Sequence, residues 1–392
     1  MRIITAISPR PRLMAFVMAS PSSPWLEYGW WLECDRRSKW AGKRREPADS
    51  GGAVLDPVTV SELDLALVHA LQVRPRASWS HLAPLLGATA VTLARRWERL
   101  TEEGLAWVSA VPGPAFAHGG CTAFVFLRCA PAARERLAAR VAELPEAVTV
   151  ELLAPGRADL MLDVLASDPG TVHRFVDEEL AALPDVLDVE CVFATSLYAE
   201  GSRWRLGSLD ASQLSVLGRP RAGDAAGTPL ADLSALDRAL LDALVRDGRT
   251  RLTELADLTG TSAATARRRL HRLTTGGIVA FRCDVAPAVS GLPVSVTFRG
   301  HAPAHDVNRL HRTLATLTEC RLLAAVTGAA NVLATYWLRD IGAVQQRETA
   351  ACAHLPALHI TERVLGTRTV KRMGHLLDGA GRRTGVRPIR PW

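Results

Sequence analysis

Five basic side chains crowd one short stretch of the sequence and could neutralise the phosphates of a polyanion. They are Arg267, Arg268, Arg269, His271 and Arg272. No acidic residue lies between Thr261 and Gly277 to offset the repulsion among them, as a solvated surface helix would usually provide. The stretch therefore predicts a cationic helix that needs an anionic partner. An ordinary solvated helix face is the alternative interpretation.

The spacing of the neighbouring residues predicts the element that positions these side chains. Ala266, Leu270 and Leu273 recur at i, i+4 and i+7, so they form one apolar stripe that a helix can bury. Two shorter helical patterns precede this helix, and Gly260 supplies the tight turn before it. The apolar pair Ile278-Val279 follows it. Three short helices and a following strand predict a winged helix-turn-helix, which is a DNA-binding motif.

The N-terminal part of the last helix in such a motif reaches base edges, and flanking cations neutralise phosphates. We therefore predict a DNA-binding set in which three side chains lie nearest the groove, namely Ser262, Thr265 and Arg269. Arg268 and Arg272 serve as phosphate or base partners, and Arg249, at the start of the second helix, contacts backbone phosphate. If about five phosphates are neutralised per half-site, the logarithm of the affinity should fall with the logarithm of salt concentration at a slope of roughly −4 to −5.

The whole motif occurs twice, at a spacing of 173 residues that requires no gap from residue 63 to residue 104. Leu63-Asp64 matches Leu236-Asp237, and Gly87 matches Gly260. Such a register indicates an internal duplication, so both copies should fold alike. The matching arginines of the first copy join the predicted DNA-binding set. They are Arg95, Arg96 and Arg99.

The first copy departs from the second in ways that predict weaker DNA binding. Pro84 falls inside its second helix, where it removes a backbone donor. Glu98 takes the place of His271 on the last helix, so fewer cations remain for phosphates. We expect the second copy to dominate the affinity for DNA.

Each motif is followed by an alternating pattern of strands and helices. In the first copy, strand-like segments at 122–129, 148–153, 159–165 and 186–197 alternate with helix-like segments at 131–144 and 169–183. The second copy repeats this order between residues 294 and 365. A short loop joins the two middle strands of each copy, from Gly156 to Asp159 and from Gly328 to Asn331. The pattern predicts a βαββαβ domain, an antiparallel sheet with helices on one face.

The predicted fold class is therefore α+β, with two copies of a winged helix-turn-helix followed by a ferredoxin-like βαββαβ domain. We expect a disordered extension or mis-assigned start at 1–57. The first copy then contains a degenerate winged helix-turn-helix at 58–112 and a ferredoxin-like domain at 120–198, and a linker follows at 199–232. The second copy contains a winged helix-turn-helix at 233–286 and a ferredoxin-like domain at 290–375, followed by a disordered tail at 376–392. The linker assignment rests on a composition rich in Gly, Ala, Ser, Arg and Asp.

Composition and charge limit which classes of protein and partner remain possible. The net charge of +7 comes mostly from the two ends of the chain, so nucleic-acid binding has to be argued from local patches. Seven scattered cysteines without a C-x-x-C pair predict neither a disulfide framework nor a zinc site, and they fit a reducing cytoplasm. No segment approaches the roughly 20 apolar residues of a membrane span, so no membrane partner is expected.

The order of helix-turn-helix, short connection and βαββαβ domain resembles the Lrp/AsnC (feast/famine) family of transcriptional regulators, here in a tandem-duplicated form. The motifs that carry the resemblance are Asp247-Gly248-Arg249, the segment from Thr265 to Leu273, and the loop from Gly328 to Asn331 in place of the family's Gly-x-x-Asp loop. The resemblance covers residues 60–375. It implies a regulator that binds double-stranded operator DNA and associates through its α+β (RAM/AsnC-type) domain.

The same resemblance implies an effector site for an amino acid or related small molecule at the Gly-x-x-Asp loops. In this sequence the matching residues are Gly156 and Asp159 in the first copy, and Gly328 and Asn331 in the second. Asn331 lacks the charge that would pair with an effector ammonium, so the two loops should not bind an effector equally well. A plain β-hairpin turn is the alternative interpretation of both loops.

Two copies in one chain could pair their α+β domains as an intramolecular pseudo-dimer, and further association into a homo-oligomer is expected. Such a pseudo-dimer would present two non-identical readers to the DNA. Asymmetric operators would then be possible, because the symmetry of the half-sites mirrors that of the protein.

The rival interpretations are an enzyme and a ligand sensor that does not bind DNA. Sirohaem decarboxylases resemble the same family and also work as paired or fused copies. A metal or tetrapyrrole site would draw on His301, His305 and His311, but no further ligand lies near them in the sequence. The sequence predicts no catalytic residue, no cofactor and no metal site, and the intact arginine-rich helix favours DNA over catalysis.

Overall fold

A computed structural model describes residues 60–218 and 233–392, apart from the side chain of His118 and seven residues at 308, 310, 311, 313, 315, 316 and 318. The extension predicted at 1–57 and residues 219–232 of the predicted linker lie outside the described residues. Among the helices that are described, none has the length and apolar character needed to cross a bilayer.

Three helices form each helix-turn-helix domain. They are α1 (Glu62–Val73), α2 (Trp79–Leu86) and α3 (Ala90–Glu102) in the first copy, and α8 (Ala235–Arg246), α9 (Leu252–Thr259) and α10 (Ala263–Thr275) in the second. Both first helices begin with a capping box, made by Ser61 with Asp64 and by Ser234 with Asp237. Each second helix ends at the expected turn glycine, whose φ is 61° in the first copy and 64° in the second.

An antiparallel ribbon of two strands joins the helix-turn-helix domains. It consists of β1 (Ala106–Pro112) and β6 (Val279–Val285), the wings of the two copies. Ser109 lies directly opposite Arg282 in this ribbon. Because Arg282 is also the counterpart of Ser109 under the repeat of 173 residues, the pseudo-twofold axis that relates the copies passes between these two residues.

The βαββαβ order is present in both copies. After α4 (Phe116–Gly119), the first copy contains β2 (Cys121–Cys129), η1 (Pro131–Ala133), α5 (Arg134–Ala142), β3 (Ala147–Leu153), β4 (Leu160–Ala166), α6 (Pro169–Arg174), η2 (Phe175–Leu180) and β5 (Val186–Ala199). After α11 (Pro287–Ser290), the second contains β7 (Val294–His301), α12 (Ala304–Val307), β8 (Cys320–Val326), β9 (Val332–Leu338), α14 (Ala343–His354) and β10 (His359–Arg372). The predicted strands and fold class are therefore confirmed.

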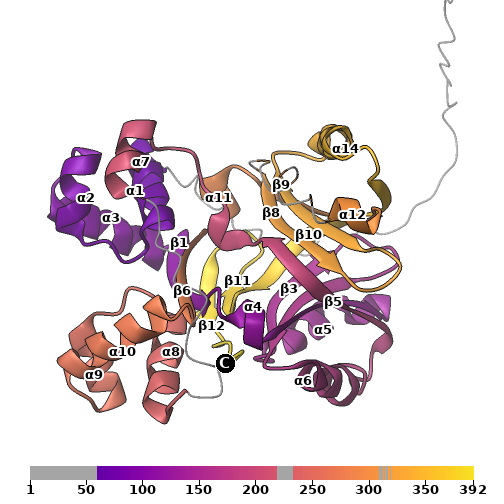
Figure 1. Cartoon of the computed structure of the whole chain (residues 1–392), viewed down its shortest axis with the longest axis horizontal. Coiled ribbons are helices and arrows are strands. Elements are labelled where there is room, and N and C mark those ends of the chain that lie inside the picture. The colour runs from indigo at the N-terminus through magenta and orange to yellow at the C-terminus, as the bar shows by residue number, and fades with distance from the viewer. Residues whose placement is uncertain are drawn as a thin grey trace, which may run out of the picture. The chain divides into compact units, whose positions relative to one another are not determined.

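The two four-stranded sheets close into one antiparallel barrel (Figure 1). The strand order is β3-β4-β2-β5-β8-β9-β7-β10, and β10 pairs with β3 as well as with β7. Ala194 lies opposite Val326 at one junction, and Gly366 lies opposite Leu153 at the other. Closure pairs the edge strands of each sheet with those of the other copy, so the barrel forms within a single chain.

Apolar side chains fill both faces of the barrel wall. Helices α5, α6 and α14 cover its outer face, through residues such as Leu137, Val172 and Ala351. The inner face carries a smaller apolar cluster that includes Phe124 and Met161. The inner face is not wholly apolar, however, because charged side chains from several strands also point inward, as described below.

The structure differs from the linker expected at 199–232. Residues 199–218 contain η3 (Gly201–Arg203) and α7 (Ala211–Leu217), and Trp204, Leu209 and Leu217 are buried in the core of the first helix-turn-helix domain. The backbone N–H of Leu209 donates to Nδ1 of His69 at 2.9 Å. This part of the chain is a component of the domain, because these three buried side chains pack into its core.

The structure also differs from the disordered tail expected at 376–392. This segment forms β11 (His375–Leu377) and β12 (Arg383–Val386), and then returns to the second helix-turn-helix domain. Ile389 and Trp392 are buried in the core of that domain, and Arg238 donates to the carbonyl of Trp392 at 2.5 Å. In both copies, the chain after the last barrel strand therefore returns to the DNA-binding domain of its own copy.

Candidate nucleic-acid interface

The recognition helices α3 and α10 expose only part of their basic side chains. On α10 the exposed ones include Arg267, Arg268 and His271, whereas the central arginine exposed on α3 is Arg95. Arg95 and Arg268 occupy equivalent positions in the two copies. These side chains lie on the surface of the third helix, where a helix-turn-helix protein approaches the major groove.

The N-terminus of α10 is held by its own hydroxyl groups. Ser262 is exposed, and its Oγ accepts a hydrogen bond from the backbone N–H of Thr265 at 3.1 Å. The two hydroxyls also lie 3.0 Å apart. Capping fixes the helix end that the sequence places nearest the bases, and leaves the Ser262 side chain at the surface.

Two arginines of α10, the half-buried Arg269 and the exposed Arg272, bind a buried carboxylate on α8. Arg272 and Arg269 approach one oxygen of Asp237 at 2.6 and 3.3 Å. Ser234 donates to the same oxygen from its hydroxyl at 2.6 Å and from its backbone N–H at 3.1 Å. Asp237 is fully buried. These two arginines therefore tie the recognition helix to the capping box of the first helix.

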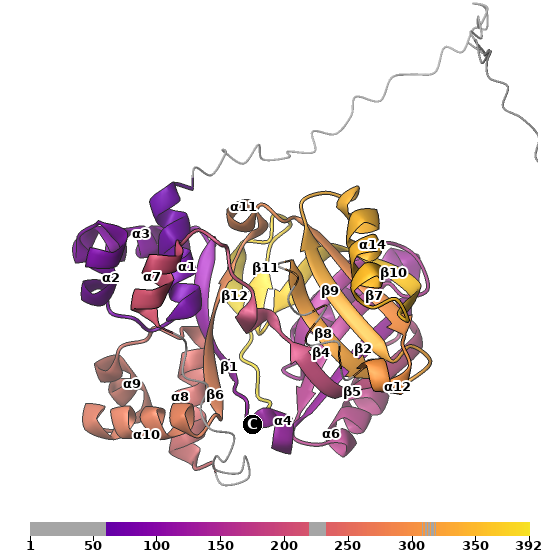
Figure 2. The ribbon, with the colours of Figure 1, turned by 45° about the horizontal axis from the view of Figure 1, so that its top comes forward.

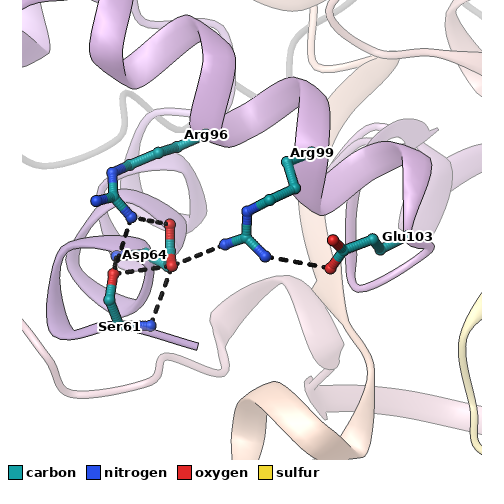
Figure 3. Close-up of polar contacts among 5 residues, drawn as sticks. All are labelled: Ser61, Asp64, Arg96, Arg99 and Glu103. Atoms are coloured by element: carbon teal, nitrogen blue, oxygen red, sulfur yellow. Dashed lines mark hydrogen bonds and ion pairs between the residues drawn. The ribbon is translucent and has the colours of Figure 1, made fainter. Parts of the chain in front are cut away.

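The first copy contains the same clamp in a slightly different geometry (Figure 3). Arg96 binds one oxygen of Asp64 at 3.0 Å, and Arg99 binds the other at 2.9 Å. Arg99 also reaches Glu103 at 3.1 Å, and Ser61 caps the helix as in the second copy. Both carboxylate oxygens of Asp64 are used, whereas Oδ1 of Asp237 has no hydrogen-bond partner among the described residues.

The clamps keep both carboxylates ionised despite their burial. Desolvation opposes ionisation of Asp237, but hydrogen bonds from Ser234 and the charges of Arg272 and Arg269 outweigh it, so the pKa of Asp237 is lowered. The pKa of Asp64 is lowered by the equivalent groups of the first copy, again against desolvation. Each clamp is thus a charged structural contact inside its domain.

Arg249 lies at the contact between the two helix-turn-helix domains. It donates to the carbonyls of Pro75 and Ala77 at 2.6 and 2.9 Å, and its guanidinium lies 3.9 Å from the ring centroid of Trp79. Burial and the nearby charge of Arg76 lower the pKa of Arg249 to about 10. These contacts occupy the guanidinium of Arg249, the group expected to bind phosphate, so Arg249 is not included in the DNA-binding set that we propose.

Arg76, the counterpart of Arg249, makes the reciprocal contact. It donates to the carbonyls of Gly248 and Thr250, the latter at 3.0 Å, and lies 5.2 Å from the ring centroid of Phe281. Pro75 and Ala77 are the counterparts of Gly248 and Thr250, so each arginine binds the same two carbonyls of the other copy. We call this pair of contacts the Arg76/Arg249 lock. It fixes the two recognition helices relative to each other.

The predicted DNA-binding set therefore divides into groups with different surroundings. Arg268, Arg95 and Ser262 are exposed and form no ion pair with any described residue, and Thr265 is half-buried. The arginines that bind the buried carboxylates are Arg269, Arg272, Arg96 and Arg99, and Arg249 belongs to the lock. The side chains of the clamp arginines remain between 33% and 42% exposed, so their outer edges can still approach phosphate. Sequence spacing alone did not separate these groups, because all of these arginines lie on or next to the same motif.

Val91 is a candidate reader that sequence reasoning missed. It lies in the first turn of α3 with 61% of its surface exposed, and Ala264 is its counterpart on α10. An exposed valine at the start of a recognition helix can contact the methyl group of thymine. The available signal was the apolar residue beside the cap, where the matching position of the other copy holds a smaller side chain.

The two Gly-x-x-Asp-type loops use their polar side chains internally. Asp159 accepts a hydrogen bond from the backbone N–H of Cys129 at 2.9 Å and pairs with Arg134 at 3.1 Å. Asn331 accepts from the N–H of Ala302 at 2.9 Å and donates to its carbonyl at 2.8 Å. Amide and carboxylate thus serve the same purpose, attaching each loop to the end of a strand. Gly156 and Gly328 are exposed, and Gly328 has φ of 98°.

Two recognition helices related by a pseudo-twofold axis, joined to a barrel of α+β domains, define a protein of the helix-turn-helix DNA-binding class. The model of the AsnC-type helix-turn-helix domain matches residues 60–101 and 233–274, and that of the Lrp/AsnC ligand-binding domain matches residues 122–204. The chain belongs to the Lrp/AsnC family of DNA-binding transcriptional regulators.

Two similar proteins are uncharacterised HTH-type transcriptional regulators of archaea. The one from Pyrococcus abyssi is 28% identical over 144 residues, which is 36% of this chain and 90% of that protein. The one from Pyrococcus horikoshii is 27% identical over 141 residues, which is 36% of this chain and 89% of that protein. Each of these matches therefore has the length of a single copy.

The whole two-copy architecture has a counterpart among solved structures. The siroheme decarboxylase NirDL, solved with an iron-uroporphyrin III analogue, matches 80% of this chain and 93% of its own with a TM-score of 0.53. The two sequences are 14% identical. This likeness shows a shared fold alone.

Proposed function

We propose that this chain binds double-stranded DNA as an intramolecular pseudo-dimer, with α3 and α10 reading two adjacent half-sites that differ in sequence. The observation that carries the proposal is the Arg76/Arg249 lock, because it holds two unequal recognition helices at one fixed separation. A helix-turn-helix dimer contacts half-sites about one helical turn apart, so a fixed separation selects a fixed spacing on DNA.

The exposed charges support α10 as the stronger reader. Its surface carries Arg267, Arg268 and His271, whereas the equivalent surface of α3 carries Arg95 beside Glu98. With about four phosphates neutralised by the whole chain, the logarithm of the affinity should fall with the logarithm of salt concentration at a slope of roughly −3 to −4. This slope is smaller than the sequence alone suggested, since the clamp arginines are already paired.

The proposal is tested by salt-titrated binding of the full chain to the DNA upstream of its own coding region and to unrelated DNA. Arg268→Ala should weaken specific binding about 30-fold, and Arg95→Ala about 5-fold, because each removes one exposed cation from a recognition helix. Arg246→Ala is the matched control, since Arg246 is exposed on α8 outside the recognition helices. Equal losses for all three variants, or no preference over unrelated DNA, would contradict the proposal.

We further propose that a small effector modulates the binding of DNA. The family's ligand-binding domain supports this proposal, although Asp159 and Asn331 are engaged by their own strands at the loops where an effector was expected. An amino-acid panel added to the binding assay tests the loop site. The proposal predicts that an amino acid shifts the DNA affinity of the wild type. Asp159→Asn should abolish this shift, whereas Asp188→Asn, the same change at an exposed position, should leave it intact.

We infer that the chain is not a decarboxylase, although one observation favours that second candidate. The shared fold with NirDL extends over both copies, and a large cavity in this chain is lined by several arginines. The lining contains no histidine among the described residues. Absorbance near the Soret band after addition of an iron uroporphyrin is the test, and a saturable band at one equivalent would favour the enzyme.

A further inference from the structure

A cavity of about 1620 Å³ lies between the β1–β6 ribbon and the inner face of the barrel. Its lining includes Arg282 from the ribbon and side chains from barrel strands of both copies. Ligand sites usually have volumes of about 300–1,000 Å³, so a small molecule would occupy only part of this space. Figure 2 shows the ribbon and the barrel strands that enclose it.

The positive charges of this cavity already have partners. Arg282 and Arg321 bind Asp284 of the ribbon at 2.6 and 3.2 Å. Arg321 and Arg372 each lie 4.5 Å from the ring centroid of Trp337. Arg372 also donates to the carbonyl of Val285 at 3.2 Å. The guanidinium groups are therefore held against the ribbon by a carboxylate, a carbonyl and an indole ring.

Two buried carboxylates of the cavity have no such contact partner. Glu151 on β3 and Asp163 on β4 both line it, and neither forms an ion pair within 4 Å with any other described residue. Hydroxyl groups hydrogen-bond to both: Ser295 and Thr369 to Glu151, and Thr149 to Asp163. Burial raises the pKa of Asp163 to about 6 and also raises the pKa of Glu151. The charges of Arg282, which acts on Asp163, and of Arg372, which acts on Glu151, do not offset this burial, and neither carboxylate has an ion-pair partner in direct contact among the described residues.

The two carboxylates lie within reach of one ligand group. Asp163 is paired with Thr149 across the strands, and Glu151 with Met161, so the two acids are diagonal neighbours on one face of the sheet. Diagonal neighbours in an antiparallel pair have Cβ atoms about 7 Å apart. A single ammonium group, with three donors, can hydrogen-bond to both.

We propose that this cavity binds one small molecule carrying a protonated amino group, held between the carboxylates of Glu151 and Asp163. Phe124, Met161 and Phe193 line the same cavity and provide apolar surface for the substituent of the amine. A carboxylic acid or a uroporphyrin would instead bring further negative charge towards the two unpaired carboxylates. The chemistry of the site therefore selects an apolar primary amine.

The site occurs once in each chain because the two copies contribute different residues. The counterpart of Asp163 in the second copy is Thr335, and the counterparts of Arg282 and Asp284 in the first are Ser109 and Val111. Residues related by the pseudo-twofold axis therefore differ in charge at these three positions. A stoichiometry of one amine per chain follows from this asymmetry.

The test is isothermal titration calorimetry of the full chain without DNA. The probes are 2-phenylethylamine, phenylalanine and 3-phenylpropanoate, which share a phenyl group and differ in their charged groups. We expect 2-phenylethylamine to bind at one equivalent and 3-phenylpropanoate not to bind. Asp163→Asn and Glu151→Gln should each weaken amine binding at least 10-fold. Asp188→Asn, the same change at an exposed carboxylate outside the cavity, should leave it unaltered.

Asp163→Asn keeps the shape of the side chain and removes only its charge, so this variant should fold. Its far-UV circular dichroism, compared with that of the control, verifies the fold. Tighter binding of 3-phenylpropanoate or phenylalanine than of 2-phenylethylamine would overturn the amine assignment. Two equivalents per chain, or amine binding that neither variant weakens, would overturn the site.

The ribbon offers a route from this site to DNA, and this part of the inference rests on the proposed function. A ligand ammonium beside Asp163 would repel Arg282, which lies on the pseudo-twofold axis between the helix-turn-helix domains. The amine should then change DNA affinity in the wild type and not in Asp163→Asn. Calorimetric binding without any DNA affinity would refute the proposed function and leave the amine site in place.

Discussion

The two helix-turn-helix domains have closely similar interiors and different exteriors. Each one binds a buried aspartate with two arginines from its third helix, and each contributes one arginine to the lock. Their solvent-facing helix surfaces share Arg95 and Arg268 but differ at the neighbouring positions, where Ala94 and Glu98 replace Arg267 and His271. An arginine that is present in both copies is therefore not necessarily a DNA contact. Half of the cationic motif holds the domain together.

The largest expected effect concerns the clamps. Asp64→Ala should destabilise the first domain by about 3 kcal/mol, and Asp237→Ala the second by about 2 kcal/mol, because each change removes the acceptor half of a capping box and charge-assisted hydrogen bonds. The loss of stability should be larger for Asp64→Ala, because both carboxylate oxygens of Asp64 bind arginine. Hydrogen exchange of the α1 and α8 amides measures each domain separately. A smaller loss for Asp64→Ala than for Asp237→Ala would mean that the second arginine-bound oxygen of Asp64 adds no stability.

The clamps also give a pH dependence whose sign follows from the lowered pKa values of Asp64 and Asp237. A carboxylate with a lowered folded-state pKa stabilises the fold above its unfolded pKa of about 3.9, and this contribution is lost as the pH falls through the folded value. The protection of α1 and α8 amides should therefore fall as the pH drops below about 4 in the wild type. The alanine variants should show less of this loss.

The lock should produce the next largest effect. Arg249→Ala should weaken the contact between the domains by about 1–2 kcal/mol, and Arg76→Ala by about 1 kcal/mol, because a cation stacks better on tryptophan than on phenylalanine. The double variant should bind DNA with half-sites at altered spacing as well as it binds the native spacing. Competition among DNAs of stepped spacing measures this preference, with Arg246→Ala as the control. A preference that survives the double variant would show that the ribbon alone fixes the separation.

Exchange of the exterior residues should give a smaller change. Ala94→Arg combined with Glu98→His gives α3 the exposed charges of α10, and affinity for DNA should rise about 5-fold, or about 1 kcal/mol. The salt slope should steepen by about 1. Salt-titrated binding measures both. An unchanged affinity would mean that α3 does not approach the phosphates at all, and the two domains would then differ in role rather than in strength.

The smallest effect belongs to the first turn of α3. Val91→Ala should reduce the preference for one thymine by about 0.5–1 kcal/mol, because it removes an apolar contact with the thymine methyl group. Replacement of individual thymines by uracil in the DNA should abolish the same preference in the wild type. Ala264→Val makes the reverse change in the second domain. If the uracil series shows no position that depends on Val91, the residue is not a reader.

Local patterns determined the order of elements. The repeat of 173 residues, the turn glycines and the capping boxes lie within short segments, so spacing and residue type specify them without knowledge of the fold. The βαββαβ order follows from the same kind of pattern. Composition misjudged residues 199–218 and 376–392, because burial of a few residues such as Trp204 and Trp392 outweighs a polar average.

The sequence by itself determined that this protein has two helix-turn-helix domains and two α+β domains, and that its arginines gather on the third helix of each motif. Only the tertiary structure decided which of those arginines are available, because the buried partners, Asp64 and Asp237, lie on a different helix from the arginines that they bind. It also decided that β10 pairs with β3 to close the barrel. Closure places Glu151 and Asp163 of the first copy in one cavity with Arg282 and Arg372 of the second. Charges so distant in the chain become neighbours through packing, and no local spacing encodes that.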